Sequence, residues 1–286
     1  MIGYDCFEYR GFVWRRLHQT LVPLTMPHVD PELTIDQAKQ LLSENRALLI
    51  RWDSEFDQRS NGEWWHVIKD SPEDLSTLKP NVRYEIRRGL KSYDIWKCER
   101  NTILVEGYTV YRLAYERYET FEQMFSEQEF KAAINNLPKE TEFWVAADKA
   151  TGELVGFSEN LIRDGACFYV SMWFTPQSLK GYASCAMFHK MNAYYLNERG
   201  CRYVSDGSRS LSHKSNIHEF LQKKFGFRKA FSKVNIVCAP SVQVLVFIAY
   251  PFRHLFKRLD VGVGAKINVL LKLEGIRRAC NGASYE

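Results

Sequence analysis

The sequence has no Cys-x-x-Cys pair, and its seven cysteines, an odd number, are spread from Cys6 to Cys280. Zinc sites built on paired cysteines and disulfide frameworks both need cysteines at closer or matched spacings. No apolar run approaches the roughly 20 residues with which a helix crosses a bilayer. We therefore expect free thiols in a reducing compartment, no metal ion and no membrane-spanning helix.

Targeting signals, repeats and low-complexity segments are also missing from the pattern. Residues 1–10 show no basic end followed by an apolar run, so we expect no secretory signal. We find no short-period repeat and no compositionally biased stretch. These absences predict a globular protein of the cytoplasm.

Apolar and aromatic residues are abundant. Of the 286 residues, 45% are hydrophobic, including 18 Phe and 15 Tyr, which suffices for a full core in one large or two small domains. The net charge of +5 comes from the segment between Tyr250 and Arg278, whose seven basic and two acidic residues leave 32 of each sign elsewhere. A neutral body argues against DNA as a partner, because DNA binding needs a broad basic face.

The periodicity predicts a mixed α/β fold. Three strands joined by short turns, at residues 141–148, 154–162 and 167–174, predict an antiparallel meander. The other expected strands cover residues 47–56, 63–70, 94–100, 101–107, 201–206 and 227–237. A helix start is expected at Ser71, and helices are expected over residues 82–91, 109–118, 121–135, 181–199 and 214–225. Residues 1–45, interrupted by Pro23, Pro27 and Pro31, show no regular pattern.

The segment between the strand at 167–174 and the helix at 181–199 contains Lys180, Gly181 and Ala183. Backbone amides at a helix start have no partner inside the helix and attract anions such as phosphate. Gly181 allows a close approach to the backbone, and Ala183 keeps the side chain small. The pattern predicts a phosphate site at the amides of residues 180–184; the alternative is that Gly181 serves only the turn.

Residues 95–237 resemble the GNAT superfamily of acyl-CoA-dependent N-acyltransferases. The element order is that of the family, and residues 178–183 stand where the family has its pyrophosphate loop, with Ser178 in place of a basic or amide residue. Asn216, a helix and then Gly226 match the family's closing pattern. Gln222 stands where many members have a tyrosine that serves as general acid.

This resemblance implies a mostly antiparallel sheet flanked by helices, with acyl-CoA, such as acetyl-CoA, as co-substrate. The acceptor would be an amine on a small molecule or a glycan. In the family, the strand at 167–174 diverges from the strand at 201–206, and the gap receives the pantetheine arm. The implied cofactor contacts are Trp173, Phe174, Thr175, Lys180, Gly181, Tyr182, Ala183, Ser184 and Asn216. The side chains of Trp173 and Phe174 also suit the core, and Asn216 also suits a helix cap.

Acyl transfer to an amine needs a group that removes the amine proton. Asp206 ends a strand beside the expected gap and is our first catalytic candidate; the alternative is that it caps the following loop. Glu159, in the middle of a strand, is the second catalytic candidate. We expect Ser208 to contact the substrate and His189 to lie too far away, about two helical turns beyond the loop.

Residues 79–91 resemble a segment of Fem-type aminoacyltransferases, which pair two GNAT-like halves and add amino acids to cell-wall precursors. That resemblance implies aminoacyl-tRNA as donor and an envelope precursor as acceptor. Arg83 and Arg87 lie four residues apart on one helical face and suit a phosphate or carboxylate of the substrate. The alternative is a solvated basic face.

Residues 251–278 contain two apolar stripes, Phe252, Leu255, Phe256 and Leu259 and then Ile267, Leu270 and Leu271, with basic residues beside them. A basic amphipathic helix can lie in a membrane interface, so peripheral contact with the inner membrane face is one interpretation. Docking of the stripes on the body or on a second copy is the other.

We expect three regions: a reduced GNAT-like half at 1–93, a GNAT-like acyltransferase domain at 94–240 and a basic helical tail at 241–286. The expected function is an acyl-CoA-dependent N-acyltransferase of cell-envelope or polysaccharide metabolism. Two alternatives remain. One is a Fem-like transferase that uses aminoacyl-tRNA, and the other is an inactive GNAT-fold binding protein, which Gln222 and Ser178 favour.

Overall fold

The computed structural model describes residues 5–17, 19–59, 61–116, 123–210, 216–256 and 262–282. The described chain forms two compact units. Unit 1 contains Val67–Gly207 and Ile217–Arg228, and unit 2 contains Asp5–His66, Ser208–Asn216 and Lys229–Glu286. These units divide the chain before Val67 and after Arg228. The three regions expected from the sequence, with boundaries after residues 93 and 240, stay a prediction.

Unit 1 is built on a sheet whose strand order is β10-β9-β8-β7-β6. Neighbouring strands are antiparallel except β9 and β10, which are parallel. The strands are β6 (Tyr93–Cys98), β7 (Thr141–Asp148), β8 (Leu154–Arg163), β9 (Ala166–Phe174) and β10 (Val204–Ser208). The predicted meander and the mixed, mostly antiparallel fold class are confirmed. Strands β5 (Trp65–Lys69) and β11 (Arg228–Cys238) contain the boundary between the units.

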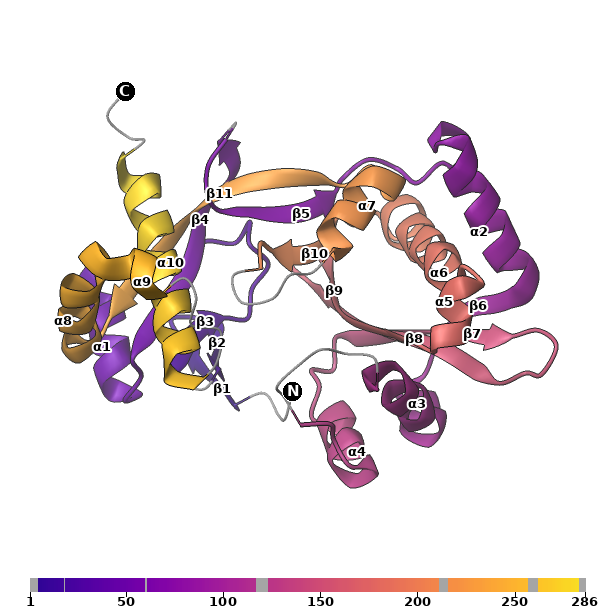
Figure 1. Cartoon of the computed structure of the whole chain (residues 1–286), viewed down its shortest axis with the longest axis horizontal. Helices are drawn as coiled ribbons and strands as arrows, with labels where there is room; N and C mark the ends of the chain where they lie inside the picture. Colours follow the sequence, from indigo (N-terminus) through magenta and orange to yellow (C-terminus); the bar gives the residue numbers. More distant parts are fainter. Residues whose placement is uncertain are drawn as a thin grey trace. The chain divides into compact units, whose positions relative to one another are not determined.

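Helices cover both faces of this sheet (Figure 1). One face carries α3 (Arg100–Tyr115) and α4 (Glu127–Asn135), and the other carries α6 (Ala183–Asn192). Helix α2 (Pro80–Ser92) packs on α6. The remaining helical elements of unit 1 are η1 (Leu75–Thr77), α5 (Pro176–Lys180), η2 (Ala193–Glu198) and α7 (Ile217–Phe225).

The strand expected over residues 101–107 is wrong, because these residues begin α3. The run of apolar and β-branched residues after Asn101 favours a strand locally. In the fold, Ile103, Gly107 and Val110 share one buried helical face, which packs on β8 and β9. Tertiary burial of a stripe with the period of a helix therefore overrides the local preference.

The helix start expected at Ser71 is also wrong. Asp74, and not Ser71, accepts a hydrogen bond from the Ser76 amide and begins the short η1. The helix expected over 82–91 is confirmed by α2, where Pro80 occupies the first turn. The helix expected over 181–199 is confirmed as α6 and the π-helical η2, which ends before Gly200 at φ +69°.

Unit 2 shows that the irregular pattern expected for residues 1–45 is wrong. Three strands, β1 (Asp5–Tyr9), β2 (Phe12–Leu17) and β3 (Thr20–Pro23), are joined in the order β1-β2-β3-β4-β11 with β4 (Leu49–Arg59). Helix α1 (Ile35–Glu44) follows, with a capping box between Thr34 and Gln37. The elements are short, so their periodicity is weak in the sequence.

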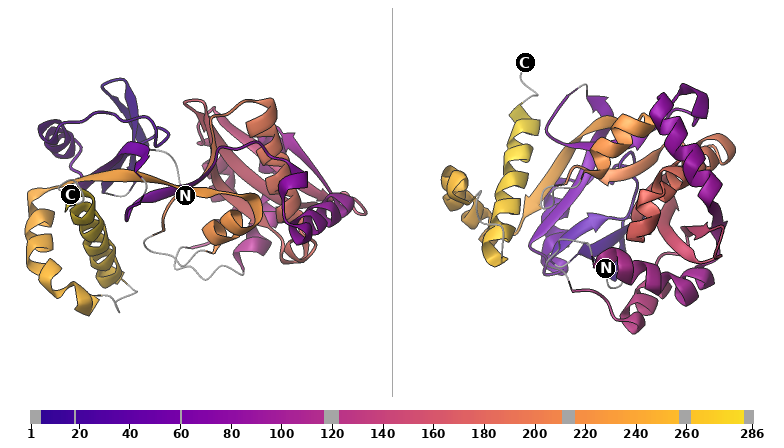
Figure 2. Two further views of the ribbon diagram at one scale, coloured as in Figure 1. Left: turned by 90° about the horizontal axis from the view of Figure 1, so that it is seen from above. Right: turned by 45° about the vertical axis from the view of Figure 1, so that its right-hand side comes forward.

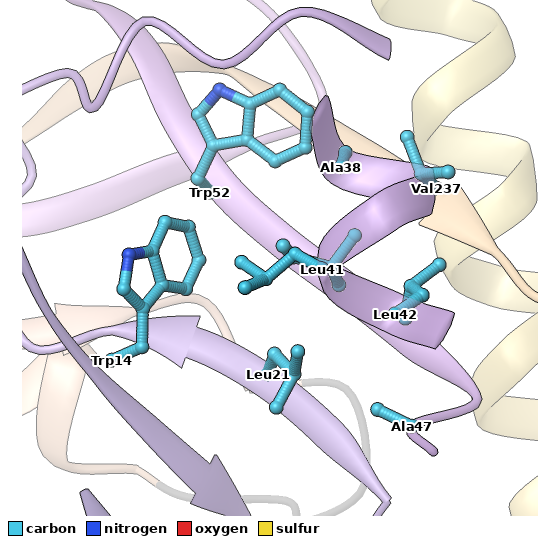
Figure 3. Packing of buried hydrophobic residues seen from close by; sticks show 9 residues of the cluster. Trp14, Leu21, Ala38, Leu41, Leu42, Ala47, Trp52 and Val237 are labelled. Carbon is cyan, nitrogen blue, oxygen red and sulfur yellow. The ribbon is translucent and has the colours of Figure 1, made fainter. Parts of the chain in front are cut away.

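The core of unit 2 lies between α1 and these strands (Figure 3). Leu41 and Leu42 of α1 face Trp14 of β2 and Leu21 of β3, and all four side chains are buried. Helix α1, with Ala38, Leu41 and Leu42 inward, thus covers a sheet that local patterns do not reveal.

The last elements of unit 2 are α8 (Pro240–Ala249), η3 (Tyr250–Phe252), α9 (Arg253–Phe256) and α10 (Gly262–Gly282). Figure 2 shows α8 beside α10. Leu273 and Ile276 of α10 pack in one buried cluster with Trp64 and Val234. No helix in the described part of the chain combines the length and the hydropathy required to cross a membrane.

Candidate active site

Strands β9 and β10 pair only at their beginnings. Val204 pairs with Cys167 and Ser205 with Phe168, and in the described residues this ladder goes no further although β9 continues to Phe174. Gly207 explains the divergence: its φ is +89°, and its amide donates to the Ser205 hydroxyl at 3.0 Å instead of to β9. The gap expected between these strands is therefore present.

A bulge in β9 lies beside this gap. Glu159 of β8 pairs with Ser171, whereas the next residue, Asn160, pairs with Tyr169, so Val170 is the extra residue. A bulge leaves its extra residue outside the regular ladder and bends the strand. The bend and the Gly207 turn together separate the edges of β9 and β10 at the level of Asp206.

Asp206 pairs with a histidine at this point. Its Oδ2 lies 3.3 Å from Nε2 of His218 on α7, and the two side chains are 14% and 13% exposed. Burial raises the pKa of Asp206 above its usual value, and the hydrogen bond and charge of His218 offset only part of that effect. A carboxylate with a raised pKa is a stronger base, so the pair is suited to accept a proton near the gap.

The sequence reasoning missed His218. Asp206 and His218 lie 12 positions apart, and a parallel strand and a following helix bring them together. A usable signal was present: His218 is in the first turn of the helix that follows Asn216, the position already singled out.

Glu159 is held away from Asp206. It lies on the sheet face that carries Phe157 and Trp173. The ring centroid of Phe157 lies 6.1 Å from that of Phe130 on α4, and the ring centroid of Trp173 lies 4.8 Å from that of Tyr111 on α3. Asp206 faces α7, which packs on the opposite, α6 side through Phe220 and Phe188. The sheet therefore separates the two catalytic candidates.

Glu159 nevertheless has a strongly perturbed carboxyl group. Burial raises the pKa of Glu159 to about 7, and a hydrogen bond with Ser171 opposes that increase. Ser171 also accepts a hydrogen bond from Trp173 Nε1 at 3.2 Å. Such a group can exchange a proton near neutral pH, so Glu159 remains a second candidate on the α3 side.

The amides expected to be free at residues 180–184 are partly used. Helix α5 adds a turn that the sequence did not predict, and the Gly181 and Tyr182 amides donate to the carbonyls of Gln177 and Leu179, both at 3.2 Å. Helix α6 then begins at Ala183 after Tyr182 at φ +66°, with no side-chain cap. The available donors are thus those of the first turn of α6, beginning at Ala183.

Gly181 is required by packing. A Cβ atom at this position would lie 2.1 Å from the hydroxyl oxygen of Tyr93, which no side chain tolerates. A Cβ on Gly89 of α2 would likewise lie 2.5 Å from the Tyr182 carbonyl oxygen. Helix α2 and Tyr93 therefore press against the turn from one side, and Gly181 has a structural role whether or not it also faces a ligand.

Ser178 has a structural role as well. It is buried, and its hydroxyl donates to the carbonyls of Val155 and Thr175 at 3.0 and 2.9 Å. Thr175 in turn caps α5, and its amide donates to Val155 at 2.9 Å. The substitution of the family's basic or amide residue by Ser178 thus anchors α5 to β8.

The other implied cofactor residues differ in exposure. Lys180 is exposed, Tyr182 and Ser184 are half-buried, and Ala183 is buried. Trp173 and Phe174 pair with β8 and contribute their side chains to the packing of unit 1, as the alternative interpretation expected. Beside this turn, Glu85 of α2 contacts the Cys185 thiol at 3.5 Å and is paired with Lys224 of α7.

Arg83 and Arg87 share a groove of about 810 Å³ along α2. The groove is lined by Pro80, Arg83, Tyr84, Arg87, Arg88, Lys91 and Ser92. Arg83 also donates to the Ser76 carbonyl at 3.0 Å, which fixes η1 on α2. The predicted basic residues therefore form one continuous surface of α2.

Ser208 and Asn216 belong to unit 2, although they follow β10 and precede α7 in the chain. Their contacts with a substrate or cofactor remain predictions. His189 is part of a buried network in unit 1, where its Nδ1 lies 2.8 Å from Glu73 Oε1 and Asn192 donates to Oε2. This network attaches the segment before η1 to α6.

Unit 2 has its own carboxylate and histidine pair. Asp53 Oδ1 lies 3.1 Å from His66 Nε2 and accepts hydrogen bonds from Trp64 Nε1 at 2.5 Å and from Ser232 Oγ at 3.2 Å. Among the residues that the structure describes, no three His, Cys, Asp or Glu side chains are placed to hold a metal ion.

Solved structures share this fold. FemX superimposes with a TM-score of 0.59 at 9% identity, covering 85% of this chain and 90% of FemX. L-PGS from Bacillus licheniformis gives 0.53 at 15% identity, covering 82% of this chain and 83% of that one. The C-terminal domain of a proposed lysylphosphatidylglycerol synthetase from Agrobacterium fabrum gives 0.54 at 12%, covering 86% and 87%.

At these identities the likeness establishes the fold. The resemblance to GNAT-like and Fem-type proteins is thus confirmed for the architecture, over most of the chain. No protein-family profile matches the sequence, and no curated protein sequence matches it.

Proposed function

We propose that this protein is a transferase that moves an acyl group from acyl-CoA to an amine, with the reacting carbonyl in the gap between β9 and β10. The observation that carries the proposal is the end of β9–β10 pairing after Ser205, immediately before Asp206. Open backbone edges of strands bind extended ligands by adding hydrogen bonds, as an extra strand would. The pantetheine arm has amide groups suited to that role.

In the proposed reaction the amine nitrogen attacks the thioester carbonyl carbon while the Asp206 carboxylate accepts the amine proton. The carbon–sulfur bond then breaks, and CoA leaves as a thiolate that takes up a proton from Asp206. His218 positions Asp206 and stabilises its charged form. Glu159, with its raised pKa, is the alternative base for an acceptor that approaches from the α3 side.

The first turn of α6 would hold the diphosphate of the donor. It has no side-chain cap, Lys180 adds an exposed positive charge, and Arg88 lies 6.0 Å from the ring of Tyr182. An anion at a helix start gains roughly 0.3–2 kcal/mol from the helix dipole. Trp173, Phe174 and Thr175 would lie along the arm, and a contact of Asn216 with the donor stays a prediction from the resemblance.

A second candidate donor is aminoacyl-tRNA. Two observations favour it: the fold is shared with FemX over 85% of the chain, and the α2 groove offers Arg83, Arg87, Arg88 and Lys91 to phosphates. The same base would then act on an amine or hydroxyl that attacks the aminoacyl ester. The Agrobacterium neighbour is named for a lysylated lipid product, so an envelope precursor is the acceptor class that we propose for this alternative.

Binding measurements distinguish the donors. We expect calorimetry to give micromolar affinity for acetyl-CoA and free CoA. Ser184→Asp should weaken that binding at least tenfold, because a carboxylate in the first turn of α6 suits the helix but repels a diphosphate. Ser184→Asn is the matched neutral control and should bind as the unchanged protein does.

The other outcomes decide between the alternatives. Binding of tRNA without binding of CoA would favour the aminoacyl-tRNA donor. In that case the double variant Arg83→Gln with Arg87→Gln should lose tRNA binding, and Arg112→Gln on α3, the matched control, should keep it. If neither ligand binds, an inactive binding protein is the better interpretation. Turnover should be followed as released CoA by chromatography, because cysteine thiols of the protein, of which Cys6 is exposed, would also react with thiol reagents.

A further inference from the structure

An apolar surface extends over α8, η3 and α9 in unit 2. Its members are exposed large hydrophobic side chains: Val244, Leu245, Phe247, Ile248, Phe252 and Leu255. Phe247 is 79% exposed and Leu255 is 73% exposed. Contiguous apolar surface of this kind is rare on a soluble protein and marks an interaction site.

Helix α8 explains why the surface is continuous. The helix contains no charged residue, and Val242, Val246 and Ala249 are the buried side by which it packs on the protein. Val244, Leu245, Phe247 and Ile248 then form an apolar outer side. A helix that is hydrophobic on every side needs an apolar environment on every side.

Helix α10 behaves differently, although the sequence grouped it with the same basic tail. Leu271, Leu273 and Ile276 are buried, and the last two contact Trp64 and Val234. Of the second stripe, Leu271 is buried and Ile267 and Leu270 are half-buried, whereas Phe252 and Leu255 of the first stripe are exposed and Leu259 lies outside the described residues. The exposed surface begins at Val244, before the segment that sequence alone singled out.

Basic residues lie beside this surface. A cavity of about 550 Å³ reaches Phe247, and its wall includes Lys39, Lys233, Arg277, Arg278 and Glu274. Glu274 pairs with both arginines, and Lys39 and Lys233 lie 3.5 and 3.6 Å from Asp36 and Glu55, so four cations face three carboxylates. Arg253 and Arg278 also lie over the ring of Tyr250, at 4.7 and 3.9 Å. Apolar side chains beside an excess of cations complement an anionic lipid bilayer, where each basic group near the headgroups adds attraction.

We propose that α8, η3 and α9 dock on the surface of an anionic bilayer. Phe247, Ile248, Phe252 and Leu255 enter the interface, and the basic cavity beside Phe247 faces the lipid phosphates. This docking does not depend on the acyl-transfer proposal, because its residues are all in unit 2 and its test requires no substrate.

Co-sedimentation with vesicles tests the proposal on the full chain. We expect binding to vesicles of phosphatidylglycerol and phosphatidylcholine, weaker binding to phosphatidylcholine alone, and a decrease with added salt. The double variant Phe247→Ser with Ile248→Ser should partition at least tenfold less. Val105→Ser on α3, which removes an equally exposed apolar residue, is the matched control and should partition unchanged.

A charge variant separates the two contributions. Lys39→Gln should weaken binding to the anionic vesicles severalfold and leave binding to neutral vesicles unchanged. Circular dichroism and an unaltered unfolding midpoint establish that each variant is folded. The proposal is overturned if the unchanged protein stays in the supernatant with anionic vesicles, or if the double variant binds them equally. A dimer that Phe247→Ser with Ile248→Ser converts to monomers, without vesicle binding, would instead assign the surface to a second copy.

Discussion

Asp206 and Asp53 each lie beside a histidine, one in unit 1 and the other in unit 2, and their pKa values move in opposite directions. Burial raises the pKa of Asp206, and His218 compensates only in part. Burial also acts on Asp53, but the charge and hydrogen bond of His66, with Arg51 and Trp64, bring its pKa below the usual value. The number of donors that converge on the carboxylate decides the direction.

Under the proposed function, the comparison separates a pair that we expect to react from a pair that stabilises the fold. Asp53 accepts hydrogen bonds from two further side chains and is fixed as an anion between β4, β5 and β11. Asp206 has its histidine at the open end of β10, where Gly207 turns the strand away. A carboxylate with one partner can take a proton during a reaction, whereas one whose Oδ1 is contacted by three side chains stabilises the fold as an anion.

The largest expected effect is on activity. Asp206→Asn should lower acyl transfer by about 10²–10⁴-fold, because the amide cannot accept the proton of the attacking amine. The measurement is the rate of CoA release with the acceptor that an amine screen identifies. Asp53→Asn is the matched change in unit 2, and its rate per folded molecule should stay within a few-fold. Equal losses in the two variants would end the distinction between the pairs.

The second effect is on stability. Asp53→Ala should lower the free energy of unfolding by about 3–5 kcal/mol, because it leaves the buried His66 without its partner and the half-buried Arg51 without the nearby negative charge. Urea unfolding measures the change, and Asp36→Ala at the exposed start of α1 is the control. Asp206→Ala should cost less than Asp53→Ala; a reversed order would show that the gap pair is the structural one.

A smaller effect is expected at Ser232. Ser232→Ala removes one hydrogen bond to Asp53 and should cost about 1–3 kcal/mol by urea unfolding, because the accepting group is charged. In the double variant Asp53→Asn with Ser232→Ala, the loss in the free energy of unfolding should be smaller than the sum of the losses in the two single variants. Strict additivity would mean that Ser232 stabilises β11 by other contacts.

The smallest effects should appear in the pH dependence, where the two aspartates have opposite signs. The lowered pKa of Asp53 gives stability that is present above its unfolded value of about 3.9 and is lost as pH falls through the folded value. The raised pKa of Asp206 favours folding below about 3.9 and loses that contribution as pH rises through the folded value. Urea unfolding at pH 3 and pH 7 should therefore show the stability of Asp206→Asn increasing relative to the unchanged protein as pH rises, and the stability of Asp53→Asn decreasing. The same sign for both would contradict the comparison.

Particular elements show how much of the fold could be predicted from the sequence. The meander of β7, β8 and β9 was predictable, because short apolar and aromatic runs and the tight turns between them are local properties of the sequence. Helix α2 was predictable from Pro80 and its apolar stripe. Residues 101–107 were not, because a run of strand-forming residues there is buried as a helical face. The short β1, β2 and β3 were missed, since each is too short to show a period.

The candidate site was predictable in part. The gap between β9 and β10 and the position of Asp206 followed from the resemblance to GNAT acyltransferases. His218 did not, because only the packing of α7 brings it to Asp206. The close packing of Tyr93 against Gly181 also could not be predicted from the sequence, because the two residues are far apart in the chain.

By itself, the sequence determined the neutral body, the basic end and the strand-to-helix segment at Lys180, because composition and short-range periodicity are properties of neighbouring residues. Only the tertiary structure decided which carboxylate is left with one partner and which receives several, and which half of the basic end is buried. Those outcomes depend on contacts between distant residues, where burial and the number of available donors are set by the whole fold.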